Sequence, residues 1–222
     1  MNKEWSELNK TMQAQIKKKD TYKMGIDTLF NLRRQLMQTL VSFKEDLCRE
    51  DFNAIPFINA DGYHSKTIAY SIWHIFRIED IVAHTVITED EQVFFTGNYQ
   101  VRINSPIITT GNELVKQQIA DFSKQLNLEE LYSYIFEVRE STEKILERFS
   151  YDELKWKIPD ERKGYLKSLN VVNCDEKAIW LIDYWCSKDI RGLIQMPFSR
   201  HWIMHTEACL RIKNKIHSSQ FI

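Results

Sequence analysis

Apolar residues recur at spacings of three and four along most of the chain, which is the periodicity of amphipathic helices. The clearest stripe predicts a long helix over about residues 21–44. Its members are Ile26, Leu29, Phe30, Leu32, Leu36, Leu40 and Phe43. Further long helices are predicted over about 65–88, after the capping sequence Asn127-Leu-Glu-Glu130, and near the C-terminus. The pattern predicts an all-α protein, an antiparallel bundle of about four long helices with shorter helices attached.

One stretch, at about 89–110, interrupts the helical pattern. Two apolar runs flank Gly97-Asn98, which resembles a short β-hairpin. The alternatives are a surface excursion that links two helices, and a lid over a functional site. Thr110-Gly-Asn-Glu113 has the form of a capping box and predicts the start of the next helix. We expect a single domain over 1–222 with this excursion inserted in it.

Composition narrows the function classes. Hydrophobic residues make up 43% and charged residues 27% of the 222 residues, as in ordinary globular proteins. The net charge of -1 gives no indication of binding to nucleic acid or to an anionic membrane. No segment approaches the ~18 apolar residues of a membrane helix, and the N-terminus lacks the apolar core of a signal peptide. We expect a small-molecule substrate rather than a nucleic-acid or membrane partner.

The four cysteines are Cys48, Cys174, Cys186 and Cys209, and no two of them form a Cys-x-x-Cys pair. Cys186 and Cys209 fall on apolar stripes and resemble small reduced core residues. This usage predicts a reducing, cytoplasmic environment.

Two histidines lie four residues apart in the apolar stripe of the last predicted helix. His201 and His205 are therefore neighbours on one face. Burying imidazoles without partners costs about 1–3 kcal/mol for each unsatisfied group, so the pair needs a reason. His74, on the apolar face of the second long helix, offers a third ring. Three neutral imidazoles with a free fourth position form a catalytic rather than a structural zinc-type site.

The other histidines fit a metal site less well. A lone histidine on an apolar face is more often a hydrogen-bonded core residue, and His74 taken alone would be one. We expect His64 to be exposed in a loop and His84 to point away from His74, because ten residues turn it about 80° round the helix. His217 is expected in a frayed tail.

Arg77, one turn beyond His74, could present a cation to a substrate carboxylate or thiolate. The simpler interpretation is an ion pair with Asp80 or Glu79. Other chemistries lack their motifs, since the chain has no His-Glu-x-x-His, no Glu-x-x-His, no nucleophile elbow and no P-loop. The sequence names no general base and no other catalytic residue.

The histidine pattern resembles that of a known group. A Trp73-His74 pair on the second long helix, with His201 and His205 on the last, resembles the DinB-like and YfiT-like superfamily of metal-dependent four-helix bundles. The resemblance implies one divalent metal ion, nickel or zinc, on these three histidines, and a homodimer. Many members continue the last pair as His-Arg-Gly-Gln, whereas Thr206-Glu-Ala208 follows His205 here.

The resemblance also implies a reaction class. Its better-understood branches transfer low-molecular-weight thiols such as bacillithiol or mycothiol onto electrophiles, or use them in isomerisation. We therefore expect a metal-dependent thiol S-transferase with a small thiol as cosubstrate. A metal-dependent hydrolase of a small ester or amide, through ionised water, is the second hypothesis. A non-enzymatic metal- or ligand-binding protein with a stress role is the third. The discriminating observation is whether the open metal position faces a pocket with room for a substrate.

Overall fold

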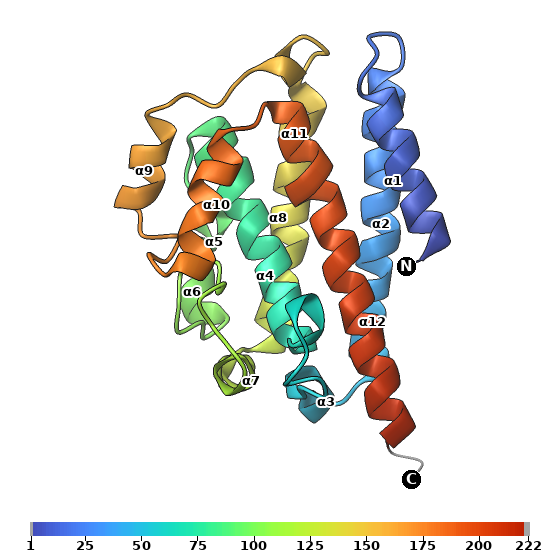
Figure 1. Cartoon of the computed structure of the whole chain (residues 1–222), viewed down its shortest axis with the longest axis vertical. Helices are drawn as coiled ribbons and strands as arrows, with labels where there is room; N and C mark the ends of the chain where they lie inside the picture. The colour runs from blue at the N-terminus through green and yellow to red at the C-terminus, as the bar shows by residue number, and fades with distance from the viewer. Residues whose placement is uncertain (1, 220–222) are drawn as a thin grey trace.

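Four long helical segments dominate the computed structural model, which describes residues 2–219 (Figure 1). They are α2 (Tyr22–Asp46), α4 (Ile68–Asp80) with its π-helical continuation η2 (Ile81–Thr88), α8 (Leu128–Arg148) and α12 (His201–Ser219). Within 2–219 no residue belongs to a β-strand, and the sole β-type pairing is an isolated bridge between Lys157 and Asp189. The expectation of an all-α protein is confirmed.

Side-chain caps explain where two of these helices begin. The Asn127 side chain accepts hydrogen bonds from the backbone N–H groups of Glu129 and Glu130, as its capping sequence predicts. The Thr67 hydroxyl accepts from the Tyr70 N–H, so α4 begins at Ile68 rather than at 65. Each cap satisfies backbone donors that the first helical turn leaves unpaired.

The long helices are not all antiparallel neighbours. Arg33 of α2 pairs with Glu143 of α8, and Lys44 pairs with Glu129, so α2 and α8 run in opposite directions. Along α4 and η2, however, the residue numbers rise together with those of their contact partners on α8. The Phe76 carbonyl accepts from Tyr134, and His84 meets Ser141.

The fully antiparallel order expected from the sequence is therefore wrong. α4 and α8 run in the same direction, opposite to α2 and α12 (Figure 1). Parallel neighbours need a connection that travels back along the helix, and residues 89–127 supply it. Periodicity reports which face of a helix is buried but not which way the helix runs.

The stretch 89–110 forms no β-hairpin. It contains two short helices, α5 (Val93–Thr96) and α6 (Tyr99–Arg102), with Asn98 between them in the left-handed region at φ +52°. The stretch links two helices, with Phe94 and Tyr99 buried against the long helices and Val101 exposed.

The apolar residues of this stretch pack on α4 and α8 instead of pairing with each other. The Asp80 carboxylate accepts hydrogen bonds from the Val93 and Phe94 N–H groups, both at 2.9 Å. This carboxylate caps the short helix from a different helix. Such a contact between distant residues leaves no signal in the local sequence.

The predicted capping box at Thr110–Glu113 does not start a helix either, because α7 spans Gln117–Gln125. Instead the loop turns at Gly111, which has φ +75°. A Cβ there would lie 2.9 Å from the Trp73 ring and 3.0 Å from Tyr70. Glycine is needed for both reasons, and it lets this loop lie directly against α4.

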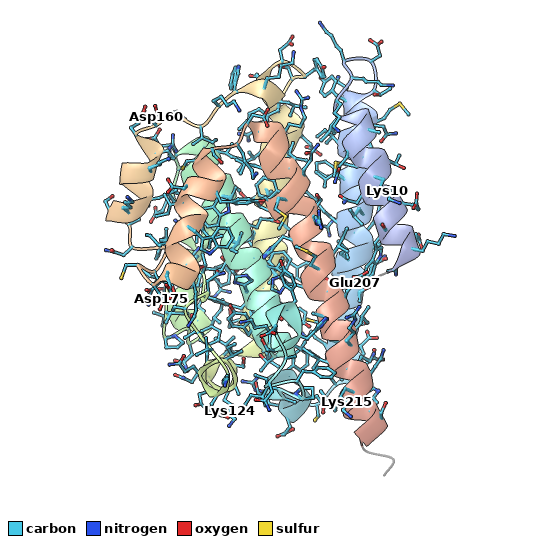
Figure 2. All side chains as sticks on the ribbon, viewed as in Figure 1. Lys10, Lys124, Asp160, Asp175, Glu207 and Lys215 are labelled. Atoms are coloured by element: carbon cyan, nitrogen blue, oxygen red, sulfur yellow. The ribbon has the colours of Figure 1, made fainter. Side chains whose placement is uncertain are left out.

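The remaining elements are short or flank the long helices. They are α1 (Lys3–Gln15), α3 (Arg49–Asn53), η1 (Gly62–His64), η3 (Glu153–Lys155), α9 (Arg162–Ser168), α10 (Glu176–Cys186), α11 (Ile190–Gln195) and the π-helical η4 (Met196–Arg200). α1 packs along α2 on one side, and α9 and α10 lie on the opposite side (Figure 1). Charged side chains such as Lys10, Lys124 and Asp160 lie at the periphery (Figure 2).

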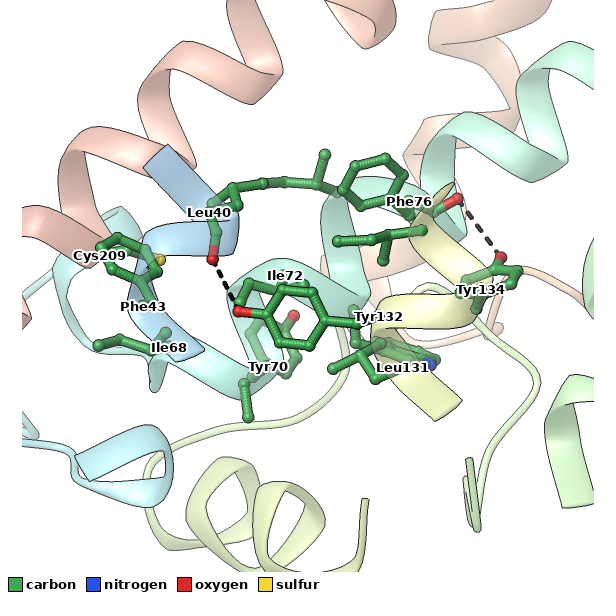
Figure 3. Close-up of a cluster of buried hydrophobic side chains, with 14 of the residues drawn as sticks. Leu40, Phe43, Ile68, Tyr70, Ile72, Phe76, Leu131, Tyr132, Tyr134 and Cys209 are labelled. Atoms are coloured by element: carbon green, nitrogen blue, oxygen red, sulfur yellow. Dashed lines mark hydrogen bonds between the residues drawn. The ribbon is translucent and has the colours of Figure 1, made fainter. Parts of the chain in front are cut away.

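The interior is mostly apolar, and several of its tyrosine hydroxyls donate to backbone carbonyls. In the cluster of Figure 3, the Tyr132 hydroxyl donates to the Leu40 carbonyl at 2.7 Å and the Tyr134 hydroxyl to that of Phe76 at 3.4 Å. All four cysteines are free thiols, with Cys186 and Cys209 buried as predicted. None of the helices described in 2–219 combines the length and apolarity needed to cross a membrane.

One buried ionic cluster fixes α12 against its neighbours. Arg33 of α2 donates to both carboxylate oxygens of Glu79, at 2.9 and 2.7 Å, and its guanidinium stacks 4.3 Å from the centroid of the Trp202 ring. The Trp202 Nε1–H donates to Glu79 at 2.7 Å. These contacts fix the orientation of Trp202 relative to α4. They also help to position His201, the residue directly before it.

Candidate metal centre

The structure brings the three predicted ligands together. His74 lies in the middle of α4, and His201 and His205 lie on the first turns of α12. The ring centroids are 4.6–5.1 Å apart, and one nitrogen from each ring lies within 4.8 Å of the others. A tetrahedral ion with bonds of about 2.0–2.1 Å holds its ligand nitrogens about 3.4 Å apart. Small side-chain rotations would bring the three nitrogens to that spacing, so this cluster could hold a metal ion.

The hydrogen bonds of the rings leave one nitrogen of each free. His74 Nδ1–H donates to the Thr110 carbonyl at 2.6 Å, which fixes the tautomer and leaves Nε2 with its lone pair. His201 and His205 have buried Nδ1 atoms with no partner among residues 2–219. Three rings that share a buried position with so few hydrogen bonds fit a metal ligand set better than a structural network.

Burial keeps these imidazoles neutral. It lowers the pKa of His74 from 6.5 to about 4, while the Thr110 carbonyl opposes and nearby Lys66 adds to the shift. Burial also lowers the pKa of His201 and His205 well below the usual value, helped by the neighbouring rings. Neutral imidazole is the form that binds a metal, so no proton has to be displaced near neutral pH.

Aromatic contacts hold the rings from the side. Tyr70 stacks on His74 with centroids 5.3 Å apart and ring planes 12° from parallel. Tyr63 presents its edge to His205 at 4.8 Å. Tyr70 is in turn fixed by its hydroxyl, which donates to the Gly111 carbonyl at 2.9 Å. The loop at Gly111 thus positions the site although it contributes no ligand.

A π-helical turn leads into the α12 ligands. The sequence predicts that Gly192 and Pro197 break the helical pattern before this pair, but Gly192 lies within α11 and does not interrupt it. Pro197 lies in η4, which runs from Met196 to Arg200 directly before His201. A π turn adds a residue to the helical repeat and is frequent at functional sites. It ends where the histidine pair begins. The pair then follows regular α geometry, with both rings on the face toward His74.

A pocket of about 260 Å³ opens beside the three histidines. Its walls come from η1, α4, α10, η4, α12 and the loop that contains Asn112. The lining residues are Tyr63, His74, Ile78, Asn112, Trp180, Leu181, Tyr184, Trp185, Met196, Pro197, His201 and His205. The walls away from the imidazoles are mostly aromatic and apolar. The pocket is large enough for a small organic molecule and offers it contact with the rings.

Two other residues considered in the sequence are structural. His84 points away from the site as predicted, with Nδ1 2.7 Å from Asp90 and Nε2 3.0 Å from Ser141. Arg77 contacts Asp80 at 3.5 Å and donates to the Ile108 carbonyl at 2.8 and 3.0 Å. Arg77 is fully buried, so the simpler interpretation, an ion pair within α4, holds and a role at the substrate does not.

The two remaining histidines differ from their expected environments. His64 is partly buried rather than exposed, and Arg211 lies 2.8 Å from its Nε2. His217 lies within the last turns of α12 rather than in a frayed tail. Neither belongs to the metal-ligand cluster.

Sequence reasoning missed most of the pocket. Tyr63 lies in the three-residue helix η1, and Lys66 and Asn112 lie in loops, so no periodicity marks these residues. Trp180 and Tyr184 lie on α10, and the sequence did not indicate that this helix borders the histidines. These residues reach the histidines only because the chain folds back, so nothing in the local sequence distinguishes them.

Comparisons with known proteins give no information about this site. No protein-family model matches the chain, and no curated protein matches it. The candidate centre therefore depends on the positions of His74, His201 and His205, their burial and the pocket beside them.

Proposed function

We propose that this protein is a metal-dependent thiol S-transferase that acts on small electrophiles, with a divalent ion held by His74, His201 and His205. The observation that supports it best is the set of three neutral, buried imidazoles at the floor of a pocket of about 260 Å³. We further propose the DinB-like four-helix bundle as its architecture, nickel or zinc as its metal, and a homodimer as its assembly.

The donor set fits such an ion. Nitrogen ligands suit zinc and nickel, and three protein ligands leave a position open to a substrate. When bound, the ion would supply a Lewis acid that favours the thiolate form of a thiol at that position. The Thr110 carbonyl holds His74 in the required tautomer, and burial keeps the other two rings unprotonated.

The chain itself contributes orientation and exclusion of water. Trp180, Tyr184 and Trp185 line the same pocket as the imidazoles. They offer apolar contact to an electrophile and keep bulk water from its reactive carbon. In the transfer, the thiolate sulfur forms a bond to that carbon, the bond to the leaving group breaks with its electron pair, and the thiol proton passes to solvent.

Metal analysis with an activity assay tests the proposal. The purified chain is expected to carry about one nickel or zinc ion, or to take one up on reconstitution. It should conjugate a low-molecular-weight thiol to 1-chloro-2,4-dinitrobenzene in the presence of metal and lose that activity after chelation. Failure to bind either metal would exclude the proposal. Ester hydrolysis without thiol would replace it by the hydrolase hypothesis, and metal binding without either activity would favour a binding protein.

A further inference from the structure

Two of the three histidines, His74 and His205, also line a second cavity. A separate cavity of about 230 Å³ shares Tyr63, His74, Asn112 and His205 with the apolar pocket. Its remaining lining residues are Gly62, Ser65, Lys66 and Tyr70. The imidazoles therefore lie where an aromatic cavity and a polar cavity meet. Two different molecules, or two unlike ends of one molecule, can approach the same ligand set.

Lys66 is the cation of the polar cavity. It directly precedes Thr67, the N-cap of α4, and it is partly buried. Its Nζ lies 5.3 Å from the centroid of the Tyr70 ring, which stacks on His74. In the described part of the chain no carboxylate forms an ion pair with it. A partly desolvated ammonium without an anion is unfavourable and would gain from one.

The charges around Lys66 favour an anion there. Burial lowers the pKa of Lys66, and the nearby Lys177 lowers it further, so the two cations repel each other. Arg200 acts electrostatically on Tyr63 and has no ion-pair partner within residues 2–219. One acid also acts here: Glu113 raises the pKa of Tyr70, is hydrogen-bonded by the Thr109 hydroxyl and makes no ion pair. Lys66 is thus the charged side chain that lines the polar cavity itself.

Asn112 adds a second recognition element. Its Oδ1 is buried and has no hydrogen-bond partner among the described residues, although its side chain borders both cavities. An unpaired buried amide oxygen is stabilised by a hydroxyl or N–H group that reaches it. Lys66 and Asn112 together match a small polar molecule that has an anionic group and a hydrogen-bond donor.

We propose that Lys66 binds the anionic group of a small molecule that enters through the polar cavity, so that this molecule's other end reaches the imidazoles. This inference depends on the proposed function, since it assigns the anionic molecule to the thiol and the aromatic pocket to the electrophile. Lys66 is then the residue that determines charge specificity, while the three histidines determine the chemistry.

A matched pair of thiols tests the proposal. 3-Mercaptopropionate and 3-mercaptopropan-1-ol have the same length and thiol but differ in their charge. Titrating each into the cobalt-loaded protein, followed by the cobalt–thiolate absorption, gives its dissociation constant. Wild-type protein should prefer the carboxylate by about tenfold, the range of one charge-assisted hydrogen bond. Lys66→Met should abolish that preference and leave binding of the alcohol unchanged, and Lys66→Arg should retain it.

Two controls separate this inference from the proposed function. Lys124→Met removes a positive charge from the periphery and should keep the tenfold preference. Calorimetric titration of succinate and of phosphate needs no thiol, and it also tells a carboxylate site from a phosphate site. Binding of either anion that weakens about tenfold in Lys66→Met supports the role of Lys66 even if no thiol reaches the cobalt. Equal binding of both thiols, or succinate and phosphate binding unaffected by Lys66→Met, would overturn it.

Discussion

Two polar clusters lie buried side by side on the same two helices, and they are built in opposite ways. Glu79 of α4 and Trp202 of α12 belong to the Arg33 cluster, in which both carboxylate oxygens, the indole N–H and the guanidinium have partners. His74 and His201 come from the same helices and are equally inaccessible. Yet the rings of the histidine cluster share a single hydrogen bond, from His74 to Thr110.

The comparison shows how a buried polar group reveals its role. Arg33 and Glu79 satisfy each other, so their burial needs nothing from outside the chain. The imidazoles of His201 and His205 are left with unpartnered nitrogens next to a cavity, and the proposed metal ion would account for their burial. The Arg33 cluster determines how α12 packs against α4. The histidine cluster depends on that packing, because its rings come from the same two helices.

Breaking the paired cluster should have the largest effect on stability. Glu79→Ala leaves the buried Arg33 with only the partly exposed Glu143 as its carboxylate partner, so the free energy of unfolding should fall by about 3–5 kcal/mol. Urea denaturation of the metal-free protein measures it. Glu79→Gln keeps a hydrogen-bond acceptor for Trp202 and should lose less. A change below about 1 kcal/mol in Glu79→Ala would show that the cluster is not the structural one.

Removing an imidazole from the histidine cluster should affect metal binding much more than stability. In His205→Ala, metal affinity should fall by at least about a hundredfold, because loss of a ligand exceeds the effect of losing an outer hydrogen bond. The unfolding free energy of the metal-free protein should change by less than about 2 kcal/mol, since the ring has an unsatisfied nitrogen. Equilibrium dialysis with zinc and urea denaturation give the two numbers. Retention of one tightly bound ion would exclude His205 as a ligand.

Acid should destabilise the metal-free protein through the same rings. The pKa of His74 is about 4 in the folded chain and about 6.5 when unfolded, so the unfolded state binds the proton first as pH falls. Stability should therefore be lost between about pH 6.5 and pH 4, and His74 alone should account for about 2 kcal/mol at pH 5. His201 and His205 act in the same direction. Urea denaturation across this pH range gives the unfolding free energy of the wild type and of a variant in which glutamine replaces all three histidines. The same pH dependence in both proteins would contradict a role of these rings.

A histidine outside both clusters should give the smallest effect. His84 is buried like His74, but Asp90 and Ser141 lie within hydrogen-bonding distance of its two nitrogens. His84→Ala should cost about 1–2 kcal/mol for the lost hydrogen bonds. Metal content should stay as in the wild type, which makes this variant the matched control for His205→Ala. Loss of metal in His84→Ala would show that the histidine cluster does not act as a separate unit.

The sequence was most informative where the signal is local. Periodicity predicted α2 within two residues at each end, and Asn127 caps α8 as expected. It failed at 89–110 and at Thr110–Glu113, where the decisive contacts come from elsewhere. The Asp80 carboxylate caps the first helix of that stretch, and Gly111 packs against Trp73 and Tyr70 of α4. A propensity calculated from neighbouring residues cannot include a cap from another helix.

The all-α class and the three imidazoles on apolar faces could be predicted from the sequence, because both follow from spacing along a single helix. The folded chain alone shows that α4 and α8 are parallel, that Arg33 and Glu79 fix α12, and that Lys66, Asn112 and the aromatic residues of α10 border the histidines. These features are relations between distant segments. Their energy comes from burial and pairing that exist only once the segments meet, so no local pattern carries them.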